Sequence, residues 1–138
     1  MFRVATYADS HFNGVDALWR EAFPNDKPWN TADVAIPEKL RVQPDLLLVA
    51  LTQDDVIGSV MAGYDGHRGW ISRIAVQKSN RLGGVGRALL AEAERRLVAL
   101  GCTKINLQVV TSNASVTSFY KRVGYAIEER VSMSKRVT

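Results

Sequence analysis

The spacing of hydrophobic residues in the first third of the chain predicts one strand followed by two helices. Phe2–Tyr7 reads as a short strand. Apolar side chains then recur at i, i+3 and i+4, which predicts an amphipathic helix that ends at Pro24. A second, weaker helix is expected between Thr31 and Val42. Pro37 must start or break that helix, because proline has no N–H to donate inside a helix.

The middle of the chain predicts a hairpin, a further strand and a long helix. Leu46–Leu51 is an unbroken apolar run, typical of a strand buried on both faces, and Val56–Tyr64 follows it after a turn. Trp70–Val76 is expected as the next strand. Val85–Leu100 carries the strongest amphipathic stripe, and Gly101 stands where a helix C-terminus favours glycine.

The last third predicts a strand, a short helix and one or two closing strands. Lys104–Val110 alternates like a strand, and Val116–Val123 has the apolar spacing of a helix that Gly124 closes. Tyr125–Met133 is expected to supply the closing strands. The order βααβββαβαβ predicts an α+β (mixed α/β) fold, in which about four helices flank a central, mostly antiparallel sheet.

Length and composition limit the chain to one folded domain, 1–138. The 138 residues are 46% hydrophobic and 23% charged, a balance that excludes disorder, collagen and coiled coil. The first residues lack the apolar core of a secretory signal, and no apolar run approaches the roughly 20 residues of a membrane span. Together with a lone cysteine, Cys102, these features predict a cytoplasmic protein without membrane partners.

Charge is divided unevenly along the chain. Residues 1–68 carry 6 basic and 10 acidic side chains, whereas residues 69–138 carry 12 basic and 4 acidic ones, within a net charge of +4. The second half therefore favours a polyanionic partner. A nucleic acid, an acidic membrane and a phosphorylated small molecule all fit this charge.

A glycine-rich turn lies between the strand Trp70–Val76 and the helix Val85–Leu100. Its sequence, Arg-Leu-Gly-Gly-Val-Gly-Arg over residues 81–87, places glycines and free backbone N–H groups at the start of a helix, which suits a phosphate. It is not a P-loop, since Arg87 stands where the lysine should be. A dinucleotide fingerprint also fails, because Leu89 replaces its third glycine.

The pattern Arg-x-x-Gly-x-Gly formed by Arg81, Gly84 and Gly86 resembles the coenzyme A pyrophosphate loop of the GNAT superfamily of N-acetyltransferases. Asn113-Ala-Ser and Phe119–Tyr125 are similar to the family's last helix and the strand after it, and the element order agrees over nearly the whole chain. Within the family the chain is similar to the branch that acetylates the N-terminal alanine of a ribosomal protein. It is closer still to the YpeA-type bacterial acetyltransferases.

The resemblance implies an acetyl-CoA-dependent N-acetyltransferase that transfers the acetyl group directly to a primary amine in a ternary complex. It also implies site residues. Tyr120 would be the acid that protonates the leaving thiolate. The residues implied to bind acetyl-CoA lie on the fourth strand, the glycine turn and the last helix: Ile74, Ala75, Val76, Leu82, Gly83, Gly84, Val85, Gly86, Arg87 and Asn113.

Three of these residues can also be explained by a purely structural role. Val85 can be plain core at the head of its helix, and Asn113 can be a helix N-cap. Tyr120 shares an apolar stripe with Phe119 and can be a core tyrosine. No cluster of His, Cys and carboxylate residues has metal-ligand spacing, so no metal is expected.

The departure from the family pattern is Gln108, which stands where the ribosomal branch has its glutamate base. Glutamine cannot accept a proton, so His67, Asp65, His11 or ordered water remain as candidate bases. An α-amino group, with a pKa near 8, is about a tenth free base at pH 7, and a lysine far less. A peptide N-terminus is therefore the preferred acceptor, ahead of small amines. A non-catalytic acyl-CoA-binding module is the alternative. Nucleic acid is not expected as a partner, and the oligomeric state is left open, with a homodimer among the options.

Overall fold

The structure is a computed structural model that describes all 138 residues. The chain forms two compact units, Met1–Gln108 and Val109–Thr138, and each is described by itself. Every helix is too short or too polar to span a lipid bilayer.

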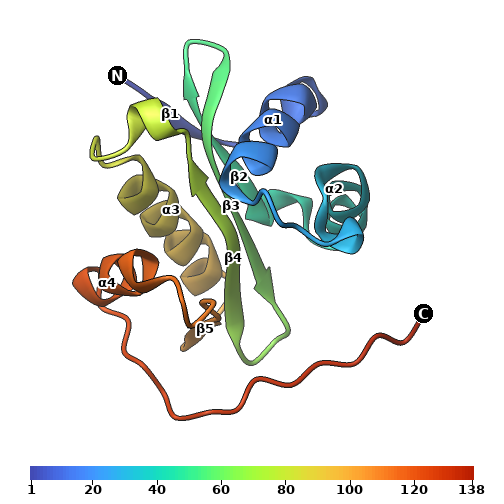
Figure 1. Cartoon of the computed structure of the whole chain (residues 1–138), viewed down its shortest axis with the longest axis vertical. Coiled ribbons are helices and arrows are strands. Elements are labelled where there is room, and N and C mark those ends of the chain that lie inside the picture. Colours follow the sequence, from blue (N-terminus) through green and yellow to red (C-terminus); the bar gives the residue numbers. More distant parts are fainter. The chain divides into compact units, whose positions relative to one another are not determined.

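The first unit is built on a five-stranded sheet whose strands follow one another in chain order (Figure 1). Neighbouring strands are antiparallel, except that the fourth and fifth are parallel. The predicted mostly antiparallel sheet and the α+β class are therefore confirmed. The strands are β1 (Arg3–Thr6), β2 (Leu47–Thr52), β3 (Asp55–Tyr64), β4 (Gly69–Val76) and β5 (Ile105–Leu107).

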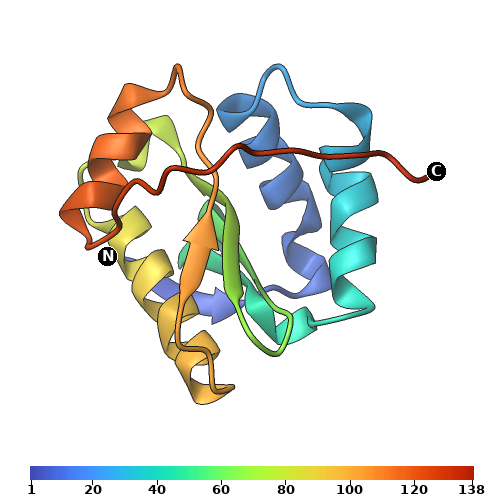
Figure 2. The same ribbon diagram turned by 90° about the horizontal axis from the view of Figure 1, so that it is seen from below.

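Helices cover both faces of this sheet. Helices α1 (Phe12–Ala22) and α2 (Ala32–Leu40) lie on one face and α3 (Val85–Ala99) lies on the other (Figures 1 and 2). Strand β2 is buried from Leu47 to Leu51, as its unbroken apolar run predicts for a strand with helices on both sides. Gly101, at φ +101°, follows the end of α3 as predicted.

The prediction for Pro37 is wrong, because this residue lies inside α2 and does not start or break it. The missing N–H leaves only the carbonyl of Asp33 without its usual helical partner, and Asp33 is an exposed residue in the first turn. Ala32 and Ile36 are each only 1% exposed, in a core cluster that also contains Trp19 of α1 and Leu47 of β2, and this burial holds the short helix together.

The second unit consists of α4 (Ala114–Arg122) and an extended segment. Gly124 has φ +103° and closes the helix, as predicted. The closing strands expected over Tyr125–Met133 are absent, since residues 125–138 form neither helix nor strand. A strand needs a neighbour for its hydrogen bonds, and the second unit contains no other strand.

Candidate functional site

The last half of β4 has an open edge within the first unit. Strand β5 pairs with β4 only along Gly69–Ile71, so the next residues of β4 have β3 on one side and no strand on the other. The N–H of Gln77 donates to Ile57 of β3 at 2.8 Å. By alternation, the main-chain groups of Val76 face the open edge. This segment, which includes Ile74, Ala75 and Val76, can therefore hydrogen-bond to a ligand through its backbone.

The glycine turn joins this strand to α3 in a conformation that exposes backbone N–H groups. Leu82 and Gly84 have left-handed φ angles of +68° and +83°. Gly84 is the N-cap of α3 and offers no side-chain cap, so the first N–H groups of the helix, from Val85 to Arg87, lack intrahelical acceptors. The Leu82 side chain is fully exposed, whereas the Val85 side chain is buried. Val85 is thus a core residue through its side chain while its N–H lies at the turn.

Positive side chains surround the turn and one of them ties it to β4. Lys78, Arg81 and Arg87 are all exposed, and no acidic residue occurs between positions 78 and 87. Arg81 Nε donates to the carbonyl of Val76 at 3.3 Å. The structure therefore brings together the end of β4 and the glycine turn, which are the two segments of the first unit that the resemblance implies to bind the cofactor. Free N–H groups, a helix N-terminus and unopposed cations fit a polyphosphate.

Asn113 caps α4 in the second unit. Its Oδ1 accepts a hydrogen bond from the N–H of Val116 at 3.3 Å, and its own N–H donates to Val110 at 2.8 Å. The helix-capping role considered from the sequence is confirmed. A contact with the cofactor remains a prediction.

Tyr120 is a buried tyrosine on α4, 6% exposed. Its ring lies edge-on to Phe119 and Tyr125, with centroids 5.3 and 5.5 Å away. Burial raises the pKa of the Tyr120 phenol to about 12, because the charged phenolate loses water. The side chain is therefore both part of a small aromatic core and a neutral hydrogen-bond donor at physiological pH.

The side chains considered as bases each have a local structural role or an exposed position. His11 Nδ1 accepts from the N–H of Ala8 at 3.0 Å before α1. Asp65 Oδ1 accepts from the N–H groups of Arg68 and His67, both at 2.7 Å, and these bonds hold the pKa of Asp65 below its usual value. A carboxylate with a lowered pKa is a weaker base. His67 is exposed in the same hairpin turn, as expected.

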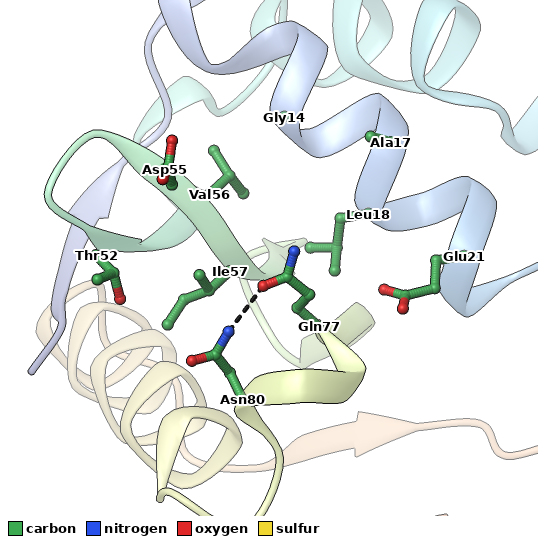
Figure 3. Close-up of a pocket in the computed structure, with 10 residues that line it drawn as sticks. All are labelled: Gly14, Ala17, Leu18, Glu21, Thr52, Asp55, Val56, Ile57, Gln77 and Asn80. Atoms are coloured by element: carbon green, nitrogen blue, oxygen red, sulfur yellow. Dashed lines mark hydrogen bonds between the residues drawn. The ribbon is translucent and has the colours of Figure 1, made fainter.

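A hollow of the first unit lies elsewhere on its surface (Figure 3). It has a volume of about 650 Å³ and lies between α1, the β2–β3 hairpin and the end of β4. Glu21 and Asp55 contribute carboxylates, and Asn80 donates to Gln77 at 2.7 Å in its wall. None of the site residues predicted from the sequence lines it. Its acidic lining does not suit a polyphosphate.

Arg73 was not singled out from the sequence, although it lies at the start of the open edge of β4. In a strand pattern it reads as an ordinary polar position. Its side chain is mostly buried and pairs with Asp26, which precedes α2 by several residues. The two residues lie 47 positions apart in the chain, so no local sequence signal marks this pairing.

Comparison with known proteins agrees with this geometry. The acetyltransferase (GNAT) family matches residues 12–125, and the chain belongs to this family. Acetyltransferase SG1711 of Sodalis glossinidius is 38% identical over 128 residues, covering 93% of this chain and 89% of the relative. Acetyltransferase ECA0875 of Pectobacterium atrosepticum is 36% identical over 134 residues, covering 97% and 94%. The predicted family and the prediction of an N-acetyltransferase enzyme are confirmed.

Solved structures share the fold. Ard1 from Thermoplasma volcanium has a TM-score of 0.82 at 21% identity, covering 92% of this chain and 84% of that one. PaiA N-acetyltransferase from Thermoplasma acidophilum, in complex with coenzyme A, has a TM-score of 0.81 at 17% identity, covering 95% and 93%. Aminoglycoside N-acetyltransferase AAC(6')-Iy, in complex with CoA, has a TM-score of 0.79 at 19% identity, covering 100% and 96%.

Proposed function

We propose that the protein transfers an acetyl group from acetyl-CoA to a primary amine, by direct transfer in a ternary complex. In this proposal residues 1–138 act as a single catalytic domain in the cytoplasm. The observation that carries the proposal is the continuity of the open edge of β4 with the glycine turn, which Arg81 ties to Val76.

The open edge and the turn have complementary parts in binding. In the segment Ile74, Ala75 and Val76, the main-chain groups on the open edge, those of Ile74 and Val76, would pair with the amide-containing arm of the cofactor, while Ala75 stays paired with Ser59 of β3. The residues Leu82, Gly83, Gly84, Val85, Gly86 and Arg87 would hold its pyrophosphate through backbone N–H groups and the helix dipole. The coenzyme A complexes of the PaiA and AAC(6')-Iy acetyltransferases support acetyl-CoA as the donor.

The chemistry needs a fixed carbonyl, an amine and a donor for the leaving group. Acetyl-CoA supplies an activated thioester. Main-chain N–H groups along β4 would stabilise the developing oxyanion. Tyr120 would donate its phenolic proton toward the departing thiolate, and its raised pKa keeps that proton in place at neutral pH. Asn113 would contact the cofactor in addition to capping α4.

We favour the N-terminus of a peptide or protein as the acceptor. Gln108 supplies no base, and a free α-amino group needs less help from a base than a lysine does. AAC(6')-Iy is an aminoglycoside acetyltransferase with a bisubstrate complex, which supports a cationic amine as the broader acceptor class. The excess of acidic side chains over residues 1–68 would attract such an amine.

A second candidate function is an acyl-CoA-binding module that does not catalyse transfer. Gln108 favours it, because an amide cannot accept the proton that the attacking amine must lose. Both functions require the same cofactor site. They differ only in whether CoA thiol is released when an amine is added.

Two measurements test the proposal. Isothermal titration should show acetyl-CoA binding with a micromolar or tighter Kd, with ATP as a polyphosphate control that binds more weakly. Thiol release should then be followed with alanine-initiated peptides, the same peptides blocked at their N-terminus, polyamines and an aminoglycoside. Release only with free N-termini supports the preferred acceptor. Binding without release supports the module, and no binding contradicts both.

A further inference from the structure

Strand β4 contains a bulge at the point where its open edge begins. Ser59 pairs with Ala75 and Met61 pairs with Ser72, so Val60 of β3 faces two residues of β4, Arg73 and Ile74. Arg73 has a φ of +54°, a left-handed conformation that costs a non-glycine residue roughly 1 kcal/mol or more. Such a conformation persists only where neighbouring groups hold it.

The bulge changes the face of the sheet on which Arg73 lies. Ile71, two residues earlier, is buried on the α3 side, where Gly69 approaches Cys102 and Leu97. In a regular strand Arg73 would follow Ile71 to that side. The extra residue instead turns the Arg73 side chain toward α1.

The guanidinium of Arg73 has three partners beside α1. Its Nη2 donates to Asp26 Oδ1 at 2.7 Å. Its Cζ lies 5.1 Å from the Trp19 ring centroid and 4.4 Å from that of Phe23. The two charged side chains are only 13% and 17% exposed, so their attraction is screened less than that of a surface pair.

The main chain of the bulge is held as well. The carbonyl of Arg73 accepts from Ser59 Oγ at 2.9 Å, and the same Oγ accepts from Trp19 Nε1 at 2.8 Å. Ser59 is fully buried. Side chain and backbone of Arg73 are therefore both fixed to α1 and to the segment that follows it.

We propose that Arg73 and Asp26 form a positioning pair that sets the geometry of the transfer reaction. This inference rests on the proposed function. The pair ties the connection between α1 and α2 to the residue directly before Ile74–Val76, the backbone proposed to orient the thioester. Neither residue is proposed to touch the reacting atoms. Their contribution is to keep the carbonyl-binding backbone and the α1–α2 connection in one fixed arrangement.

The glycine turn, at the other end of the open edge, would supply most of the cofactor affinity. Loss of the pair should therefore lower kcat and leave the Kd for acetyl-CoA nearly unchanged. Small misplacements of reacting groups cost about tenfold to a hundredfold in rate. We expect Arg73→Gln and Asp26→Asn each to lower kcat about tenfold or more, with the Kd for acetyl-CoA within about threefold of the wild type.

The double variant tests whether Arg73 and Asp26 act through their contact with each other. Since each substitution breaks the same contact, Arg73→Gln with Asp26→Asn should be no slower than the worse single variant. Arg96→Gln is the matched control, because Arg96 pairs with Glu92 at 2.8 Å with both side chains 23% exposed, and it joins α3 to Thr6 instead. The control should lower the melting temperature and leave kcat unchanged.

The outcomes separate the two proposals. A wild-type protein that binds no acetyl-CoA, or that turns over no amine, contradicts the proposed function and this inference with it. A wild-type enzyme whose folded Arg73→Gln and Asp26→Asn variants keep full kcat contradicts the inference alone. Additive losses in the double variant contradict the pairing. If Arg73→Gln does not fold, the nearly isosteric Asp26→Asn still decides the kcat result.

Discussion

Tyr120 shows how burial sets the chemistry of a single residue. A phenol in water has a pKa near 10, and the apolar surroundings of Tyr120 raise the pKa to about 12. The neutral form is therefore dominant at every pH at which the enzyme is expected to work. The same burial makes Tyr120 part of the packing of α4 with Phe119 and Tyr125.

Replacing Tyr120 by phenylalanine tests the catalytic role with little change in shape. We expect Tyr120→Phe to lower kcat by about 100-fold, because the leaving thiolate loses its proton donor, while the Kd for acetyl-CoA is retained. In the wild type, kcat should show no decline from ionisation of this phenol up to about pH 10, because its pKa is about 12. Steady-state kinetics from pH 6 to 10 check both points. An unchanged kcat in the variant would remove Tyr120 from catalysis.

The raised pKa also predicts a stability difference at high pH. The folded state binds the phenolic proton more tightly than the unfolded state does. The resulting stabilisation is complete below pH 10 and is lost as the pH rises through about 12. Thermal unfolding should therefore show the wild type losing stability relative to Tyr120→Phe between pH 10 and 12, with no such divergence between pH 6 and 9.

Residues differ in how far their positions follow from the sequence. Tyr120 and Asn113 lie where helical spacing and capping preference put them, because both depend on neighbours in the chain. Arg73 does not, because its environment depends on a bulge that inserts one residue into β4 and reverses its face. The pattern of polar and apolar residues contains no mark of that insertion. Long-range pairing, here with Asp26, is equally absent from local sequence.

At the scale of elements, α3 is held close to the sheet by a glycine of β3. A Cβ added to Gly58 would lie 2.9 Å from Leu89, 3.0 Å from Val85 and 3.2 Å from the carbonyl of Ala75. The carbonyl belongs to the backbone and cannot turn away. Because Val85 begins α3, the fit at Gly58 also fixes the start of the helix that carries the proposed phosphate site.

Gly58→Ala should therefore destabilise the protein and weaken cofactor binding. Overpacking of this kind costs about 1–3 kcal/mol, which urea unfolding would measure directly. Gly63→Ala is the control in the same strand, since its Cβ would meet nothing closer than Lys39 Nζ at 3.7 Å. We expect the control to keep both its stability and its Kd for acetyl-CoA. Equal behaviour of the two variants would show that α3 can shift without cost.

A helix or strand could be predicted from the sequence where the residues that determine it lie within the element itself. Helix α3 follows from its apolar stripe and Gly101, and β2 follows from its continuous apolar run. Tyr125–Met133 has an alternating pattern that permits a strand, yet a strand also needs a partner edge, which the pattern cannot supply. At Pro37 the local signal predicts a break that does not occur. The burial of Ala32 and Ile36 outweighs the unfavourable effect of a proline inside a helix.

At the scale of the whole molecule, the uneven charge has a defined consequence for the proposed ligand. Residues 69–138 carry 12 basic and 4 acidic side chains, and Lys78, Arg81 and Arg87 surround one glycine turn. Elsewhere in this half, Arg73 forms an ion pair with Asp26. Arg95 and Arg96 of α3 both bond to Glu92. The turn, by contrast, has three exposed cations within ten residues and no acidic residue among them.

The affinity for acetyl-CoA should consequently fall as salt is added. The cations at the turn are exposed, and at 0.5 M salt charges farther apart than about 4 Å are largely screened. We expect the Kd to rise about tenfold between 50 and 500 mM NaCl, and Arg87→Gln to raise the Kd at low salt and flatten this dependence. Arg95→Gln is the control, because Arg95 lies two turns further along α3 and is already paired with Glu92. Titrations of the three proteins across salt concentrations provide the measurement.

Two results would change the interpretation of this charge. A Kd for acetyl-CoA that is independent of salt would mean that backbone N–H groups alone hold the pyrophosphate. Salt-sensitive RNA binding that acetyl-CoA fails to displace would assign the basic half to a nucleic acid.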